Sequence, residues 1–499
     1  MNTEEKNPLA SASVRSLMLK YALPSVIALV VNALYNIVDQ IFIGWGVGTL
    51  GNSATNVIFP LNMVVTALAL LLGDGGAAHL SLELGRDEKK NAEKGANNTF
   101  SWLILVGILM FVVCAVFLKP MTAWLGATQD NLPYALAYGR IIVIGFPFVI
   151  VGCGMCSLIR ADGTPHLTMI SMIVGCVANV ILDAVFVLGF GWGMEGAAIA
   201  TVIGQILTFA LSMWYVPRFK TVKLSLHKMK PELRMLKRIA SLGVSSFISQ
   251  FAVAVVIAVV NACLVRYGTA SEYGPDIPLA AFGIVMKFNT ILVAVVTGIG
   301  TGAQPIVGYN YGRADYGRVK DTFLFAVKIA TGFAILCFAI FQLFPHQLTA
   351  IFGEQGTLYT AFSIKSFRIF TLLCFFNGFQ IVSAIFFQSI GKPVVSAVIS
   401  FSRQIIILIP AMFLLCRLLG LDGVLWAGPV ADGLSFLLAL ALILGELKKL
   451  NQSNAAARNE VPVRRRLRSR KQQDGTPEPR RYTAQEKGTQ YEKNHHHRA

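Results

Sequence analysis

Residues 166–189 read HLTMISMIVGCVANVILDAVFVLG, an apolar run that carries a single acidic residue, Asp183. A membrane-crossing helix needs about 20 predominantly apolar residues, and this run exceeds that length. A carboxylate inside such a run is costly unless it has a task or a partner. The stretch therefore predicts a membrane-spanning helix with a functional acid within it.

Runs of this kind recur along the whole chain. It has 499 residues, of which 55% are hydrophobic and 14% are charged, whereas soluble domains carry about 25% charged residues. Backbone polar groups in lipid must bond within their own segment, so each run is expected to be an α-helix. We predict an all-α, multi-pass membrane protein of about twelve transmembrane helices. The predicted spans are 16–46, 52–79, 97–118, 133–158, 166–189, 196–216, 239–266, 278–306, 321–344, 361–388, 394–417 and 423–445.

Basic residues are distributed unevenly among the connecting loops. They gather after even-numbered spans, in the loops 86–94, 217–238 and 313–320, while the odd-numbered loops hold few of them. The formal net charge of +17 therefore lies in short loops and one tail, which argues against a nucleic-acid partner. By the positive-inside rule, both termini are predicted to be cytoplasmic in a protein of the cell (plasma) membrane.

The two halves of the chain match at a constant offset. Gly73-Asp74-Gly75 corresponds to Gly300-Thr301-Gly302, an offset of 227 residues (300 minus 73), and three further matches share it. Six helices in each half is an even number, so both halves insert the same way round and form two pseudo-symmetric six-helix bundles. The predicted domains are a first lobe over 1–216, a basic cytoplasmic linker over 217–238, a second lobe over 239–445, and a basic, disordered cytoplasmic tail over 446–499.

Two carboxylates and a hydroxyl share one depth in the first lobe. Asp39 lies seven residues before the end of the first span, Asp183 six before the end of the fifth, and Thr201 six residues into the sixth. At a rise of 1.5 Å per residue, each lies about 10 Å from the outer end. Their oxygens are expected to lie close together in the outer half of the first lobe.

The helical faces agree with this depth. Asn179 and Asp183 are spaced i, i+4, and Asn32, Asn36 and Asp39 are spaced i, i+4, i+7. Such an oxygen-rich cluster suits a proton or a hard monovalent cation such as Na⁺, with no other metal. The alternative is interhelical hydrogen bonding of structural value only. The predicted cation-coupling residues are Asp39, Asn36, Asn179, Asp183 and Thr201.

For other polar residues in the spans, a structural role competes with a role in transport. Asp74, near the inner end of the second span, is expected to snorkel toward the headgroups. Asp432 is expected either to line a cavity or to pair with Arg403, and Lys287 either carries charge or pairs locally. The residues predicted for a substrate cavity, with ordinary packing as the alternative, are Asn32, Asn377, Gln380 and Phe376.

Catalytic signatures are missing from the sequence. No Walker A, GxSxG or HExxH motif occurs, and the eight cysteines all lie in apolar runs as ordinary membrane-helix residues. We therefore predict that the protein is not an enzyme and takes no cofactor. Its energy would come from an ion gradient, with H⁺ or Na⁺ as the coupling ion.

Four motifs stand out along the spans: Leu23-Pro24, the turn RADGTP over 160–165, Asn179-x-x-x-Asp183, and GMEGAAIAT over 193–201. Together they resemble the MATE (multidrug and toxic compound extrusion) family, in its bacterial MepA and DinF branch. The resemblance implies a V-shaped pair of bundles that works by alternating access. It implies cation coupling through Asp39, Asn179, Asp183 and Thr201, and a bend of the first helix at Pro24.

The predicted function is multidrug efflux by secondary active antiport. The expected partners are small organic cations or amphiphilic drugs, with membrane lipid around a monomer. The alternative is a flippase for lipid-linked or polysaccharide precursors, which should show a larger basic cavity. A membrane receptor or scaffold would not need carboxylates buried at a matched depth.

Overall fold

The structure is a computed structural model that describes residues 8–125, 129, 131–225, 230–274, 276–351 and 356–473. Side chains are not described at 49, 50, 52, 276 and 453–473. Every regular element in the described residues is helical. The elements are α1 (Pro8–Ser11), α2 (Val14–Gly46), α3 (Thr49–Gly85), α4 (Lys89–Trp124), α5 (Leu132–Ala161), α6 (Pro165–Asp183), η1 (Ala184–Gly189), α7 (Gly193–Tyr215), η2 (Val216–Arg218), α8 (Leu233–Thr269), α9 (Asp276–Gly312), α10 (Tyr316–Leu343), α11 (Pro345–Ala350), α12 (Thr357–Phe370), α13 (Phe376–Ser389), α14 (Pro393–Phe401), η4 (Ser402–Leu408), α15 (Ile409–Leu419) and α16 (Asp422–Gln473).

The predicted all-α, multi-pass fold is confirmed. Within the described residues, 11 helical segments are long and apolar enough to cross a membrane. They coincide with all predicted spans except the tenth, 361–388, which is broken into α12 and α13. At the break, the Thr371 hydroxyl donates to the Phe367 carbonyl at 2.6 Å, and the backbone switches to tighter turns such as Cys374 N–H to Thr371 O. Side-chain bonds of this kind compete with the regular helical ladder.

The fifth and the eleventh spans each contain a π-helical segment. In the fifth span, η1 begins directly after Asp183, and in the eleventh span η4 contains Arg403. A π segment widens the helix and shifts the direction of the following side chains, and such segments are frequent at functional sites. Each half therefore carries its widened turn beside a charged residue.

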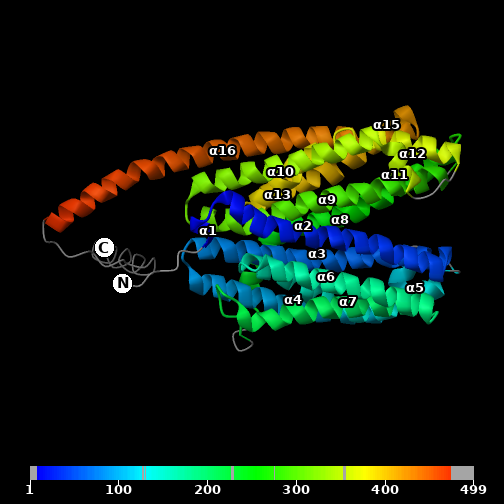
Figure 1. The fold of residues 1–499 in the computed structure, drawn as a ribbon, viewed down its shortest axis with the longest axis horizontal. Coiled ribbons are helices and arrows are strands. Elements are labelled where there is room, and N and C mark those ends of the chain that lie inside the picture. Colours follow the sequence, from blue (N-terminus) through cyan, green and yellow to red (C-terminus); the bar gives the residue numbers. More distant parts are fainter. Residues whose placement is uncertain are drawn as a thin grey trace, which may run out of the picture. The chain divides into compact units, whose positions relative to one another are not determined.

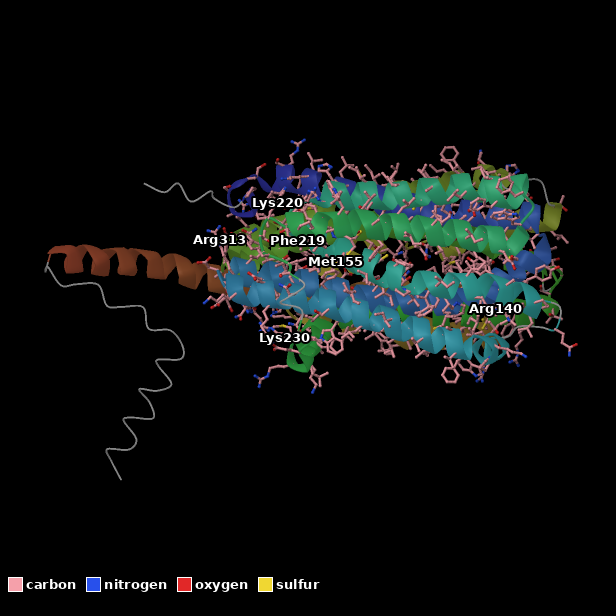
Figure 2. All side chains as sticks on the ribbon, turned by 90° about the horizontal axis from the view of Figure 1, so that it is seen from below. Arg140, Met155, Phe219, Lys220, Lys230 and Arg313 are labelled. Atoms are coloured by element: carbon pink, nitrogen blue, oxygen red, sulfur yellow. The ribbon has the colours of Figure 1, made fainter. Side chains whose placement is uncertain are left out.

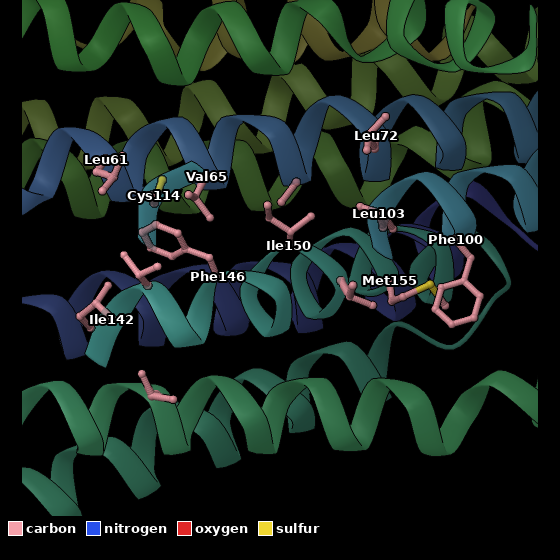
Figure 3. Packing of buried hydrophobic residues seen from close by; sticks show 14 of the residues in the cluster. Leu61, Val65, Leu72, Phe100, Leu103, Cys114, Ile142, Phe146, Ile150 and Met155 are labelled. Atoms are coloured by element: carbon pink, nitrogen blue, oxygen red, sulfur yellow. The ribbon is translucent and has the colours of Figure 1, made fainter. Parts of the chain in front are cut away.

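Helices α2 and α3 form the middle of the molecule. The other helices of the first half lie on one side of them, and the second half of the chain lies on the other. Figure 1 shows them in blue between α6 and the green pair α8 and α9, and α2 packs on both α6 and α9. The core of the first half is apolar, and Figure 3 shows Val65 of α3 with Phe146 and Ile150 of α5 between these helices. Because lipid is as apolar as these side chains, close van der Waals packing holds such helices together.

Two glycines bring α6 and α7 close together. A methyl group added at Gly204 would lie 2.6 Å from the Gly175 carbonyl oxygen and 3.2 Å from the Asn179 side chain. Only glycine therefore allows this approach, as small residues do at many membrane helix contacts. The approach sets Asn179 of α6 against Thr201 of α7.

Lysine and arginine side chains of the even-numbered loops share one end of the helices, called here the basic end. Figure 2 shows Lys220, Lys230 and Arg313 there, and Arg140 toward the opposite end. Toward the basic end the two halves pack closely. Any side chain at Gly243 of α8 would collide with the Leu71 carbonyl of α3, and one at Gly302 of α9 would collide with the backbone of Ala22 in α2.

The linker between the halves is held on the first half by one carboxylate. Asp162 follows α5 and accepts hydrogen bonds from the backbone N–H groups of Lys220 and Thr221, both at 2.8 Å, and from the hydroxyls of Thr221 at 2.6 Å and Tyr215 at 2.8 Å. Burial raises the pKa of the Asp162 carboxyl above its ordinary value, and these hydrogen bonds oppose the rise. The acid of the RADGTP turn therefore fixes the start of the linker.

The last helix extends beyond the apolar span. The chain divides after Leu447 into one compact unit up to this residue and a second unit that begins at Lys448. Helix α16 continues to Gln473, into part of the tail for which we expected disorder. The rest of that tail, 474–499, lies outside the described residues.

The second half holds a buried ion pair. Arg403 donates to Asp432 Oδ1 through Nε at 2.9 Å and lies 2.8 Å from it through Nη2. The Asp432 residue is 3% exposed. Of the two expectations for Asp432, the geometry agrees with pairing to Arg403.

Breaking this pair should be costly. We expect Arg403→Met to lower the free energy of unfolding by about 3 kcal/mol, because it leaves a buried carboxylate without its counter-charge. Adding Asp432→Leu should restore most of the loss, because the uncompensated charge is removed. Thermal unfolding of purified protein in detergent measures both. A double variant no more stable than Arg403→Met alone would contradict this role.

Candidate functional site

The fifth and sixth spans position three of the predicted site residues together. Asp183, Asn179 and Thr201 are all buried, and Asp183 is 0% exposed. The Asn179 amide fits best with its nitrogen donating to Asp183 Oδ2 at 3.2 Å and its oxygen accepting from Thr201 Oγ1 at 3.2 Å and Thr201 N–H at 3.1 Å. Asn179 therefore links the carboxyl on α6 to the hydroxyl on α7.

The second carboxyl comes from α2. The carboxyl groups of Asp39 and Asp183 lie within hydrogen-bonding reach of each other. Each has its Oδ1 buried without a donor among the described residues. Two carboxyl groups can share a hydrogen bond only when one of them is protonated. A proton shared by the pair, or a cation bound to both, would supply what these two oxygens lack.

Two tyrosines that the sequence analysis did not name belong to this cluster. Tyr138 of α5 lies near Thr201 and both carboxyls, and Tyr35 of α2 lies near Asp39 and Asp183. Tyr35 is four residues before Asp39, so the spacing that marked Asn32 and Asn36 could have found it. Tyr138 carries no such signal, because only the packing of α5 brings it here.

The other two polar residues of α2 lie apart from the carboxyls. Asn36 is exposed, and its amide donates to the Asn32 backbone carbonyl at 2.7 Å. The Asn32 side chain is half-buried and lies near Cys176 of α6. Of the α2 stripe, Asp39 and Tyr35 therefore face the cluster most directly.

Pro24 lies inside α2 and is buried. The Ser25 hydroxyl donates to the Tyr21 carbonyl at 2.8 Å in the same turn. Proline removes one backbone hydrogen bond of the helix, and such positions are where helices bend. Pro24 lies where α2 meets Gly298 and Gly302 of α9.

The residues predicted for a substrate cavity are mostly interior in this conformation. Asn377 and Gln380 are buried, and each has a side-chain oxygen without a donor among the described residues. Phe376 stacks on Phe436 with ring centroids 4.0 Å apart. All three belong to α13, directly after the break in the tenth span.

Asp74 does not snorkel as expected. It is 6% exposed and accepts hydrogen bonds from Ser157 at 2.7 Å and Ser246 at 2.8 Å. Snorkelling needs a free path to the headgroups, and the close packing of α3 against α5 and α8 closes it. Lys287, in contrast, is half-buried on α9.

Helical spans in two related halves, with a pair of carboxyl groups among the first six spans, define a multi-pass membrane transporter. A sequence model of the MatE family matches residues 24–185 and 246–414. The chain therefore belongs to the MatE family.

Similar proteins agree with this assignment. Multidrug export protein MepA of Staphylococcus aureus (strain MRSA252) is 25% identical over 442 residues, which cover 88% of this chain and 94% of that protein. MepA of Staphylococcus saprophyticus is 24% identical over 447 residues, covering 89% and 96%.

Solved structures share the fold. An outward-facing multidrug resistance MATE family transporter of the MOP superfamily superposes with a TM-score of 0.83 at 21% identity, covering 91% of this chain and 100% of that one. A MOP superfamily transporter from Pyrococcus furiosus gives 0.83 at 21% identity, covering 90% and 100%.

Removing the amide between Asp183 and Thr201 should weaken the fold. We expect Asn179→Leu to lower the free energy of unfolding by about 1–3 kcal/mol, because Asp183 loses a buried donor. Asn36→Ala is the matched control, since Asn36 is exposed and should leave stability nearly unchanged. Thermal unfolding in detergent measures both, and equal melting temperatures for the two variants would argue against the arrangement.

Proposed function

We propose that this protein exports organic, often cationic compounds by secondary active antiport against H⁺ or Na⁺. The observation that carries the proposal is the pair of carboxyl groups, Asp39 and Asp183, within hydrogen-bonding reach inside the membrane-spanning helices. Lipid disfavours such a pair unless a proton or cation occupies it. One charge moved across 100 mV is worth about 2.3 kcal/mol, which is enough to bias a two-state carrier.

The chemistry of the cluster supports ion coupling. With the pair loaded by a proton or cation, the site loses negative charge and its helices can pack closely. Unloaded, two carboxylates repel each other and attract water or a cationic substrate. Asn179, Thr201 and Tyr138 supply neutral hydrogen-bonding groups around the pair, and these serve either ion.

Substrate class is proposed from the relatives. The similar proteins from both Staphylococcus species are named multidrug export proteins. We propose the same substrate class here, taken up by a monomer in the plasma membrane. No cofactor takes part in this scheme, since the coupling ion supplies the energy.

Orientation is proposed from charge. With the basic end in the cytoplasm, both termini are cytoplasmic, as the positive-inside rule favours. Asn36 of α2 and Asn261 of α8, both toward the opposite end, are exposed. An amide at membrane depth faces water more readily than lipid, so we infer that this conformation is open to the outside.

Dye transport tests the proposal. In proteoliposomes, we expect a proton or a sodium gradient to drive efflux of a cationic dye, and Asp39→Asn and Asp183→Asn each to reduce that efflux at least about tenfold, since an amide neither binds the proton nor carries the charge. Separate gradients identify the ion. Dye export would also favour this function over precursor flipping.

Asp422→Asn is the matched control for this experiment. It makes the same chemical change at a carboxylate that pairs with Lys365 at 2.6 Å, outside the carboxyl cluster. Its efflux should stay near that of the unaltered protein. Undiminished gradient-driven efflux in both Asp39→Asn and Asp183→Asn would refute the assignment of the coupling site.

A further inference from the structure

Asp74 joins the two halves of the chain through hydrogen bonds on both sides. On the first half, Ser157 of α5 donates to its Oδ1 at 2.7 Å, and Arg160 lies 3.7 Å from the same oxygen. On the second half, Ser246 of α8 donates to its Oδ2 at 2.8 Å, and Gln304 of α9 donates to its backbone carbonyl at 3.3 Å. One buried carboxylate therefore takes donors from both halves.

If the two halves separated, Asp74 would keep its partners on the first half and lose those on the second half. Arg160 also donates to the Ser157 hydroxyl at 3.1 Å, so Asp74 keeps its counter-charge within the first half. Ser246 belongs to the second half, where it accepts from Gln388 at 3.2 Å. Of the bonds that Asp74 makes, separation of the halves would break those from Ser246 and Gln304. The Asp74 carboxylate would still have Arg160 beside it as its counter-charge.

Further polar contacts between the halves lie nearer the basic end. Glu83 of α3, nine residues beyond Asp74, pairs with Arg238 of α8 at 2.6 Å. Arg318 of α10 donates to the backbone carbonyls of Leu9 at 3.2 Å and Ala12 at 2.7 Å, just before α2. Asp74 is thus the contact farthest toward the membrane interior in this series, where water is excluded and hydrogen bonds are stronger.

We propose that Asp74 is a positioning residue of the transport cycle, which latches the halves together at the basic end and releases Ser246 when that end opens. The repeat places Thr301 at the corresponding position of the second half, and among the described residues its hydroxyl bonds within its own helix, to the Gly298 carbonyl at 3.3 Å. The latch is therefore built from one side, by a carboxylate on α3. The inference rests on the alternating-access function proposed above.

Hydrogen–deuterium exchange of the purified protein tests the latch. Ser246→Ala removes one charge-assisted hydrogen bond that holds the basic end closed. Losing such a bond should raise the equilibrium constant for opening that end about tenfold or more. We expect about tenfold faster exchange in peptides over 71–85, 239–246 and 300–312. Peptides over 32–43 and 253–265, toward the opposite end, should exchange no faster, because opening one end closes the other.

The control is Ser249→Ala, on the same helix, whose hydroxyl donates to the Ser245 carbonyl at 2.8 Å and does not cross between the halves. It should exchange like the unaltered protein. Asp74→Asn should reproduce the Ser246→Ala pattern, and if that variant fails to fold, Ser246→Ala decides alone. Unchanged exchange in Ser246→Ala, or faster exchange at both ends, would overturn the latch.

Exchange is measured without substrate or an ion gradient, so its result is separate from that of dye efflux. A failed latch with intact Asp39- and Asp183-dependent efflux would leave the antiport proposal standing. If exchange follows the expected pattern but no ion gradient drives dye efflux, the latch stands and the proposed ion coupling is rejected.

Discussion

The structure of the first half depends on satisfying two carboxyl groups within its membrane spans. Asp183 is completely buried, and its polar partners are Asn179, one turn earlier on α6, and Asp39 on α2. Lipid offers no donor, so these helices must supply one. The glycine approach of α6 to α7 and the π segment after Asp183 both serve that arrangement.

The two halves share a fold and differ in charge. The first half holds a carboxyl pair with oxygens that lack donors, while the second half neutralises its buried Asp432 with Arg403. A paired acid has its counter-charge already and gains little from a proton or cation. The proposed ion site therefore belongs to the first half, and the second half carries aromatic and amide groups on α13.

Contacts between the halves are concentrated toward the basic end. Glycines at 243 and 302 let backbones meet there, and Asp74 adds hydrogen bonds across the same region. Packing between backbones is short-ranged and is lost when the helices part by a few ångströms. In the proposed cycle, opening the basic end would break these backbone contacts and hydrogen bonds. It would not disturb the carboxyl pair near the opposite end.

Sequence alone predicted the apolar spans, the repeat, and the depth of Asp39, Asp183 and Thr201, because helical rise and lipid thickness convert residue spacing into depth. Only the tertiary structure decided which faces meet. It brought Tyr138 to the cluster, left Asn36 exposed, broke the tenth span after Phe370, and turned Asp74 from an expected headgroup residue into a buried bridge. Those outcomes depend on how helices distant in sequence pack, and residue spacing within one helix carries no information about its neighbours.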